Sequence, residues 1–381
     1  MTAVITKKIT PPVHKPALLK KIIFTVTNDL VYDQRMMRIC GSLTTAGYEV
    51  LLVGFKFRKS KPLVNAAYRQ KRLSCWFTRG KFFYMEYNLR LFFFLLFQKI
   101  DCICAIDLDT ILPCYVISRL KKIKRVYDAH EYFTQLEEII SRPLIYRFWH
   151  WVERTMIPRF KDGYTVGYGI AEEFQLKYGA IYDVIRNLPV LKDIAEPEKK
   201  EKFILYQGAV NKGRGLDAVI RAMRDINIPL VIFGDGNNMK EIREIIEKEN
   251  LSGKIKLMGM IVPDELKKLT PTACVALNPF RKDGLNQYLS LSNKFFDYIH
   301  AGIPQVTMNF PEYKTINEKY KVAILIDDTS PEVISNAVNK LLLNDVLYKE
   351  LKENCLQARN ELNWQHEERK LIGFYHRLFN E

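Results

Sequence analysis

The sequence contains no long hydrophobic run. Its longest candidate, residues 89–97 (LRLFFFLLF), has about half of the roughly 20 apolar residues that a membrane-spanning helix needs. Residues 1–21 are basic and contain three prolines, without the apolar core of a signal peptide. We therefore expect no transmembrane segment, no signal peptide and a cytoplasmic location.

Paired cysteines and metal-binding spacings are missing as well. The seven cysteines follow no regular spacing, and Cys102 and Cys104 are separated by one residue, which fits no common zinc motif. Most of them fall within apolar segments, which favours buried free thiols in a reducing compartment. We expect no bound metal.

Several catalytic motifs are also absent. The turn after the first predicted strand is Thr27-Asn28-Asp29, without the GxGxxG of a dinucleotide-binding fold, and no P-loop, HExxH or GxSxG occurs. These absences leave a dehydrogenase, a kinase, a metalloprotease and a serine hydrolase without support.

Length and charge indicate the size of the protein and the kind of partner. A chain of 381 residues is too long for one ordinary domain, so we expect two. The 58 Lys and Arg against 43 Asp and Glu give a formal charge of +15, which indicates an anionic partner: a nucleotide, nucleic acid or an acidic membrane. No recognised nucleic-acid-binding module accompanies this charge, so we expect no nucleic-acid partner.

Apolar strand-like segments alternate with helical segments along most of the chain. This alternation predicts an α/β protein with two Rossmann-like, doubly wound parallel sheets that face a cleft. We expect an N-terminal domain over residues 1–190, a linker over residues 191–202 and a C-terminal domain over residues 203–362. A last helix, residues 363–381, is expected to pack back on the N-terminal domain.

Residues 56–99 break the alternation with a basic and aromatic insert that contains KFRKSK, YRQKR and WFTRGKFFYMEY. Lys and Arg favour anionic headgroups, while Trp, Tyr and Phe favour the membrane interface. The insert therefore predicts peripheral docking on an anionic membrane, at the inner face of the plasma membrane. The alternative is that its aromatic residues are core and its charges form a solvated face.

Residues 289–304 (LSLSNKFFDYIHAGIP) predict a helix with a phosphate-binding start. Ser292 or Asn293 can cap it, and Gly302 marks its end. The free backbone N–H groups of a helix start suit a phosphate, and Lys294 adds a positive charge there. Asp297, one turn further along, could accept hydrogen bonds from ribose hydroxyls. The alternative is an ordinary amphipathic helix on a sheet.

A second anion-binding pattern lies at residues 207–222 (QGAVNKGRGLDAVIRA). A strand ends at Gly208, a loop rich in glycine and basic residues follows, and a helix begins. Lys212 and Arg214 flank Gly213, where glycine lets the backbone approach a ligand and Arg offers two donors to a phosphate. The alternative is a solvated basic turn.

In this order, GxxxxxRGxxxxIxA, IxGDG and SNKFFDYIxAGIP resemble the retaining glycosyltransferases of family 4, which have the GT-B fold. The segments NDLVYDQRMMRICGSLTTAGYEV, YDAHE and VERTMIPRFKDGYTVGYGIAEEF are similar to the N-terminal domain of that family. The resemblance covers roughly residues 22–378.

The resemblance implies roles for individual residues. Arg214, with Lys212, takes the place of a lysine that neutralises the donor diphosphate, and Asp297 takes the place of a glutamate that holds the ribose. His130 matches a histidine that approaches the transferred sugar. We therefore predict catalytic roles for His130, Arg214 and Lys294. The predicted nucleotide-sugar site comprises Gly208, Lys212, Gly213, Gly234, Asp235, Ser292, Asn293 and Asp297.

Two features depart from the family pattern. Leu289 stands where the family has a glutamate that contacts sugar hydroxyls, and Asp283 or Asn286 could substitute for it. The glycine pair that usually follows the first strand is missing, and Asp33 with Arg35 could equally be a structural pair at a helix start.

Polar residues after the strands of the first half predict an acceptor side. His130 lies between Asp128 and Glu131, so its imidazole could act as an acid or a base near neutral pH. The alternative gives Asp109 and Asp128 capping and turn roles. The predicted acceptor side comprises Asn28, Asp29, Arg35, Asp107, Asp109 and Glu131.

These patterns predict an enzyme, a glycosyltransferase of the hexosyl type. It would move a sugar from a nucleotide-diphosphate sugar to a glycan or lipid-linked acceptor, in cell-surface polysaccharide synthesis. The resemblance implies retention of configuration and no cofactor or metal. Two alternatives stay open: a nucleotide-sugar 2-epimerase of the same fold, and a degenerate, non-catalytic nucleotide-binding subunit.

Overall fold

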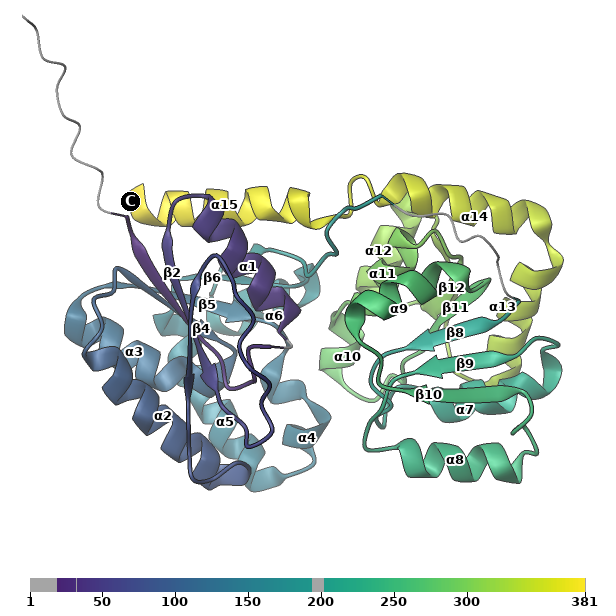
Figure 1. The fold of residues 1–381 in the computed structure, drawn as a ribbon, viewed down its shortest axis with the longest axis horizontal. Coiled ribbons are helices and arrows are strands. Elements are labelled where there is room, and N and C mark those ends of the chain that lie inside the picture. The colour runs from purple at the N-terminus through teal and green to yellow at the C-terminus, as the bar shows by residue number, and fades with distance from the viewer. Residues whose placement is uncertain (1–18, 32, 194–201, 381) are drawn as a thin grey trace, which may run out of the picture.

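Two parallel sheets organise the chain into two domains that lie side by side (Figure 1). The computed structural model describes residues 19–31, 33–193 and 202–380. Every strand pair in both sheets is parallel, and helices cover both faces of each sheet. The predicted fold class is therefore confirmed. Most of the predicted linker, residues 194–201, lies outside the described residues.

The N-terminal sheet has the strand order β3-β2-β1-β4-β5-β6-β7. The chain therefore begins in the middle of the sheet and runs first to one edge and then to the other, as in a doubly wound fold. The strands are β1 (Lys21–Thr25), β2 (Glu49–Phe55), β3 (Arg69–Leu73), β4 (Cys102–Ile106), β5 (Lys124–Ala129), β6 (Asp162–Thr165) and β7 (Asp183–Val184).

Two helical layers cover this sheet. One face packs against α1 and the C-terminal helix α15, and the other against the remaining helices. The helices of this domain are α1 (Gln34–Thr45), α2 (Gly80–Leu96), α3 (Ile111–Lys121), α4 (Glu137–Ile140), α5 (Pro143–Met156) and α6 (Tyr168–Tyr178).

Local sequence signals set the helix ends. Asp33 caps α1, where its Oδ1 accepts a hydrogen bond from the backbone N–H of Met36 at 3.0 Å. Gly302 ends the helix of residues 293–300 with φ +65°, a conformation that glycine adopts without a steric cost. Asp33 therefore has the structural role at a helix start that we gave as an alternative above.

Residues 56–99 contribute regular structure to the N-terminal domain. β3 pairs with β2 at the sheet edge, and α2 crosses back over the sheet. Phe83, Tyr87, Leu91 and Leu95 on one face of α2 are buried in the core, whereas apolar residues on its opposite face are exposed. Within the described part of the chain, no helix has the length and hydropathy needed to cross a bilayer.

The C-terminal sheet has the order β10-β9-β8-β11-β12-β13. Its strands are β8 (Ile204–Gln207), β9 (Leu230–Phe233), β10 (Ile255–Gly259), β11 (Val275–Asn278), β12 (Gln305–Met308) and β13 (Ala323–Ile326). Its helices are α7 (Leu216–Ala222), α8 (Met239–Lys248), α9 (Pro263–Leu269), α10 (Leu285–Leu289), α11 (Asn293–His300), α12 (Pro311–Tyr320), α13 (Pro331–Leu343) and α14 (Asp345–Ala358).

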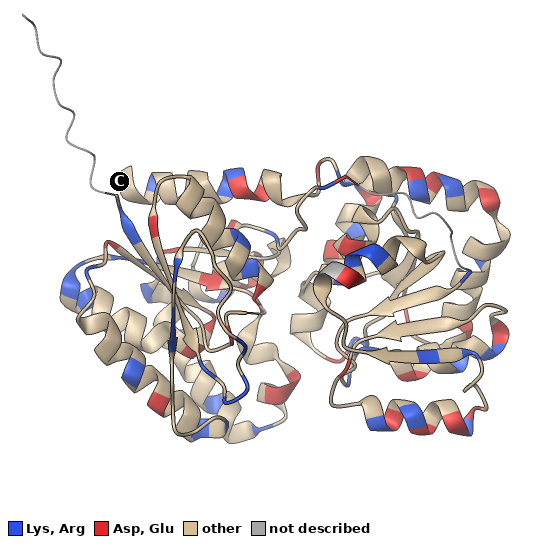
Figure 2. Ribbon diagram, in the orientation of Figure 1, with Lys and Arg blue, Asp and Glu red and all other residues tan. Residues whose placement is uncertain are grey.

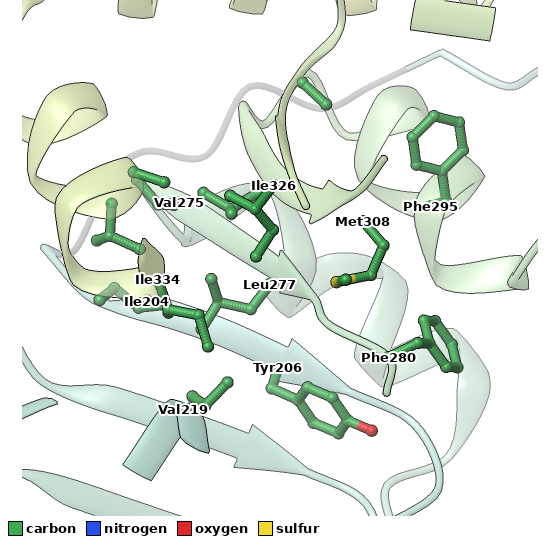
Figure 3. Close-up of a cluster of buried hydrophobic side chains, with 14 of the residues drawn as sticks. Ile204, Tyr206, Val219, Val275, Leu277, Phe280, Phe295, Met308, Ile326 and Ile334 are labelled. Carbon is green, nitrogen blue, oxygen red and sulfur yellow. The ribbon is translucent and has the colours of Figure 1, made fainter. Parts of the chain in front are cut away.

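The core of the C-terminal domain extends to the end of the sheet where the strands terminate. Tyr206 and Phe280 lie at the same end of this apolar cluster (Figure 3). Both rings are buried, and they form the floor of the site described below.

The last helix, α15 (Trp364–Asn380), returns from the C-terminal domain and lies across α1 (Figure 1). Leu371 and Tyr375 are fully buried among residues of β1, β2 and α1. The indole N–H of Trp364 donates a hydrogen bond to Ser42 Oγ at 3.0 Å. The C-terminal end of the chain thus completes the core of the N-terminal domain.

Candidate active site

Lys294 is a buried cation of the predicted nucleotide-sugar site. It lies at the start of α11 and is 8% exposed, and its Nζ has no hydrogen-bond partner among the described residues. This nitrogen lies 3.8 Å from the ring centroid of Tyr206 and 5.2 Å from that of Phe280. Burial, and then the charge of Arg214, lower the pKa of Lys294 well below its ordinary value. An unpaired buried ammonium is unfavourable, so this position suits an anionic ligand.

Arg214 supplies a second positive charge at the same aromatic floor. Its guanidinium carbon lies 4.9 Å from the ring centroid of Phe280, which Lys294 also contacts. Gly215, with φ +67°, begins α7 immediately after it. Both cations lie near the ring of Phe280 and repel each other. A diphosphate, which carries negative charge on both phosphates, would balance them.

Two glycines bring the ends of β8 and β9 together beside these cations. A Cβ on Gly234 would lie 1.8 Å from the carbonyl oxygen of Gly208, so no other residue fits there. A Cβ on Gly208 would lie 3.8 Å from Lys294 Nζ. Gly208 therefore leaves its backbone open toward the ammonium. Gly213 packs against the side chain of Gln287.

The remaining residues of the predicted nucleotide-sugar site have other partners. Ser292 Oγ donates to Asn278 Oδ1 at 2.8 Å, and the Ser292 backbone N–H donates to the Tyr313 hydroxyl at 2.9 Å. Asn293 accepts a hydrogen bond from Asn187 of the N-terminal domain at 2.8 Å. The polar groups of Ser292 and Asn293 thus form hydrogen bonds to other residues of the protein. Lys212 is exposed, and Asp235 accepts from the N–H of Gly236.

Asp297 is held by side chains that the sequence does not single out. Its Oδ2 accepts a hydrogen bond from Gln207 Nε2 at 3.1 Å, and Gln207 Oε1 accepts one from Thr270 Oγ1 at 2.8 Å. Burial raises the pKa of Asp297 to about 6, against the opposing charge of Arg38 from the N-terminal domain. The carboxyl group therefore lies where the two domains meet.

Arg35, Asp128 and His130 form a triad of contacting side chains in the N-terminal domain. Asp128 pairs with Arg35 through a contact of 3.0 Å and with His130 Nε2 at 3.0 Å. Burial alone would raise the pKa of Asp128, but the charges of Arg35 and His130 outweigh it and lower this pKa. Burial alone would lower the pKa of His130, and Asp128 raises it instead. The triad thus holds the imidazole in one orientation and favours its charged form.

Asp107 and Asp109 follow β4 beside this triad. Asp107 has φ +50°, and its Oδ1 accepts a hydrogen bond from the backbone N–H of His130 at 2.9 Å. Asp109 Oδ2 accepts one from Thr27 Oγ1 at 2.5 Å. Burial raises the pKa of Asp107 to about 8 and that of Asp109 to about 6. A non-glycine residue at positive φ among titratable groups is typical of a functional site.

Glu131 of the N-terminal domain lies within electrostatic range of Arg214 in the C-terminal domain. Its side chain is exposed, yet partial desolvation by the surrounding protein raises the pKa of its carboxyl group, and the charge of Arg214 offsets part of this rise. The structure therefore brings the predicted residues together in two groups that face each other. One group contains His130, Glu131, Asp107, Asp109 and Arg35, and the other contains Gly208, Gly213, Arg214, Gly234 and Lys294.

Two predicted acceptor-side residues, Asn28 and Asp29, have side-chain partners within the N-terminal domain. Asp29 forms an ion pair with Arg72 of β3 at 3.1 Å, and Asn28 donates a hydrogen bond to Asp33 at 2.9 Å. Both interactions hold the turn after β1. In this arrangement their polar groups are used within the N-terminal domain.

The position of Leu289 explains why an apolar residue stands where the family has a glutamate. It is buried in the apolar cluster of the N-terminal domain and packs against Gly169, although it belongs to α10 of the other domain (Figure 1). Asn286, one turn earlier, accepts a hydrogen bond from the backbone N–H of Tyr132 at 2.7 Å. Glu312 of α12 pairs with Arg186 in the same interface at 3.5 Å. α10 thus works as a contact between domains.

Comparison with known proteins finds similar glycosyltransferases. Residues 190–358 match the family model described as Glycosyl transferases group 1. The C-terminal half carries a glycosyltransferase group 1 domain. An uncharacterized glycosyltransferase of Methanocaldococcus jannaschii is 24% identical over 180 residues, which are 46% of this chain and 48% of that protein. The chain thus spans about half the length of that relative. A second one from the same organism is 22% identical over 283 residues, 69% of this chain and 70% of that protein.

Solved structures confirm the GT-B fold. A sucrose-phosphate synthase from Thermosynechococcus elongatus superposes with a TM-score of 0.80 at 14% identity, covering 95% of this chain and 99% of that one. The Anabaena protein HepE, in complex with UDP-glucose, superposes with a TM-score of 0.74 at 11% identity, covering 93% of this chain and 99% of that one.

Proposed function

We propose that this protein is a retaining glycosyltransferase of family 4. It transfers a hexose from a nucleotide-diphosphate sugar to a glycan or lipid-linked acceptor, in the synthesis of cell-surface polysaccharide. The donor binds on the C-terminal domain and the acceptor approaches from the N-terminal domain. The glycosyltransferase group 1 domain and the UDP-glucose bound to the similar Anabaena protein support this assignment.

One observation carries the proposal: the buried Lys294 ammonium has no hydrogen-bond partner among the residues that the structure describes, and it lies beside the open backbone of Gly208 and the Arg214 guanidinium. A protein gains nothing in stability from such a group. A diphosphate would supply the missing acceptor oxygens and would balance both cations. The same two charges would stabilise the diphosphate as it leaves the sugar.

The reaction breaks the bond between the anomeric carbon of the donor and the diphosphate oxygen. The acceptor oxygen forms the new bond on the same face of the sugar, and its proton passes to the leaving phosphate oxygen. Lys294 and Arg214 balance the negative charge that develops. His130, oriented by Asp128, lies on the opposite side of the cleft, where it can donate a hydrogen bond to the transferred sugar.

Release of the nucleoside diphosphate from a purified protein tests this function. UDP- and GDP-linked sugars are first ranked by thermal shift, because a ligand that binds the folded state stabilises it. The best donor is then incubated with the protein. Arg214→Ala should lower turnover by at least about 100-fold, the effect of losing one oxyanion donor, while Arg214→Lys keeps measurable turnover. Arg243→Ala, an exposed arginine on α8, serves as the matched control. Equal turnover by Arg214→Ala and the control would disprove the site assignment.

Two alternatives predict different products. A nucleotide-sugar 2-epimerase would convert the donor to its epimer without releasing nucleotide. A non-catalytic subunit would show a thermal shift with nucleotide but no turnover. The second alternative has one specific observation behind it, because Leu289 is buried between the domains and cannot contact sugar hydroxyls.

A further inference from the structure

The helix α2 is apolar on two opposite faces. Its inner face fills the core, and its outer face exposes Phe82 (48%), Met85 (64%), Leu89 (57%) and Phe93 (52%). These positions are spaced by three and four residues, so their side chains form one stripe along the helix. An amphipathic helix of a water-facing surface would carry polar residues there. The stripe therefore indicates a surface that something apolar covers.

Helix α5 carries a similar stripe on the same side of the sheet. Leu144 (80%), Phe148 (49%) and Trp151 (55%) are exposed at spacings of four and three residues. The two helices are in contact through Tyr84 and Trp149, whose ring centroids lie 5.8 Å apart. Both pack on one face of the N-terminal sheet, together with α3. Their outward stripes therefore belong to one surface.

The charged residues of α2, α3 and α5 are mostly positive (Figure 2). Helices α2, α3 and α5 contain two acidic residues, Glu86 and Glu153. Glu86 pairs with Arg90 and accepts hydrogen bonds from two backbone N–H groups, and Glu153 is buried. The basic residues of the same helices are Lys81, Arg90, Arg119, Lys121, Arg147 and Arg154.

A shallow basic hollow of about 500 Å³ adjoins the stripe at the sheet edge. Lys71, Arg72 and Arg90 line it together with Phe93 of the stripe. The guanidinium of Arg90 lies 5.0 Å from the ring centroid of Trp76, which is 86% exposed. Cations, an exposed indole and apolar side chains therefore meet at one place, which matches the layering of a lipid headgroup region.

We propose that the outer face of α2, α3 and α5 docks on a bilayer that contains anionic lipids. The aromatic and aliphatic side chains enter the interface, and the lysines and arginines lie at the level of the phosphates. The charge argues against a second copy of the chain as the occupant, because a symmetric contact would place these cations against their own copies. The proposed surface includes α2, which belongs to the basic and aromatic segment of residues 56–99. It also includes α5, which lies outside that segment.

Vesicle binding by the full-length chain tests the proposal. Co-sedimentation is measured with phosphatidylcholine vesicles that either contain or lack phosphatidylglycerol. We expect binding to the anionic vesicles alone and a loss of binding in high salt. The double variant Leu89→Glu/Phe93→Glu should bind at least about tenfold more weakly. The matched control is Leu343→Glu/Val346→Glu, because these apolar residues are 85% and 79% exposed on the other domain.

A second variant tests the charges alone. Arg147→Ser/Arg154→Ser should weaken binding by about 25-fold, because each basic residue at an anionic surface contributes about a factor of five. Arg214→Ala should leave vesicle binding unchanged, so the result is independent of donor chemistry. Three outcomes would overturn the proposal: no binding to anionic vesicles, an equal loss in the control, or light scattering that shows a dimer which Leu89→Glu/Phe93→Glu dissociates.

Discussion

Replacing Lys294 by methionine should make the ligand-free protein more stable and abolish donor binding. An uncompensated buried charge costs about 3–5 kcal/mol, and the contact of Lys294 Nζ with the Tyr206 ring offsets about 2 kcal/mol of it. Methionine keeps the apolar stem and removes the charge. The free energy of unfolding should therefore rise by about 1–3 kcal/mol, which raises the melting temperature by a few degrees.

Thermal denaturation with and without the nucleoside diphosphate of the best-ranked donor measures both effects. At about 100 times its dissociation constant, this ligand should stabilise the wild type by about 2.7 kcal/mol and Lys294→Met by much less. The pH dependence has a definite sign, because the folded pKa of Lys294 lies below the unfolded value of about 10.4. The destabilisation is complete below the folded pKa and is relieved as the pH rises above it. Lys340→Met, an exposed lysine on α13, is the control. A Lys294→Met variant that is less stable than this control, or that the nucleoside diphosphate stabilises as much as the wild type, would refute the reasoning.

Two further predictions concern the N-terminal half of the site. Arg35→Met leaves the fully buried Asp128 carboxylate without its guanidinium partner, so urea denaturation should show a loss of about 3–5 kcal/mol; a loss below about 1 kcal/mol would contradict the role of this ion pair. The folded pKa of Asp107, about 8, lies above the ordinary value of 3.8, so the folded state keeps a proton that the unfolded state loses. Stability should therefore fall as the pH rises from about 4 to about 8, and Asp107→Asn should flatten this fall between pH 6 and 8. An unchanged slope in the variant would show that other groups cause it.

The sequence alone predicts the sheets well, because their strands are nearly continuous apolar runs bounded by turns. It also predicts the two cations of the site, because Arg214 and Lys294 each lie at the start of a helix that follows a strand of a parallel sheet. Their aromatic floor is not predictable in this way. Tyr206 and Phe280 look like ordinary core residues, and only the folded chain places both rings under Lys294.

Contacts between distant segments account for the residues whose environment the sequence does not indicate. Asp29 is bound by Arg72, which requires knowing that residues 69–73 form an edge strand. Leu289 is a contact between domains, and nothing in its local sequence distinguishes that role from a lost sugar contact. Asp297 has the residue type expected at its position, but its partner Gln207 lies 90 residues earlier in the chain.

Because α15 packs on the N-terminal domain, this domain can complete its folding only after the C-terminal domain has been synthesised. Ribosomes release the N-terminal sheet first, yet Leu371 and Tyr375 are fully buried parts of its core and emerge only after the C-terminal sheet. Until α15 has emerged, α1 and β2 lack the helix that covers them, so the domain made first cannot complete its core before the second sheet has been made. The N-terminal domain of a nascent chain is therefore exposed to misfolding, and to chaperones, throughout the synthesis of the C-terminal domain.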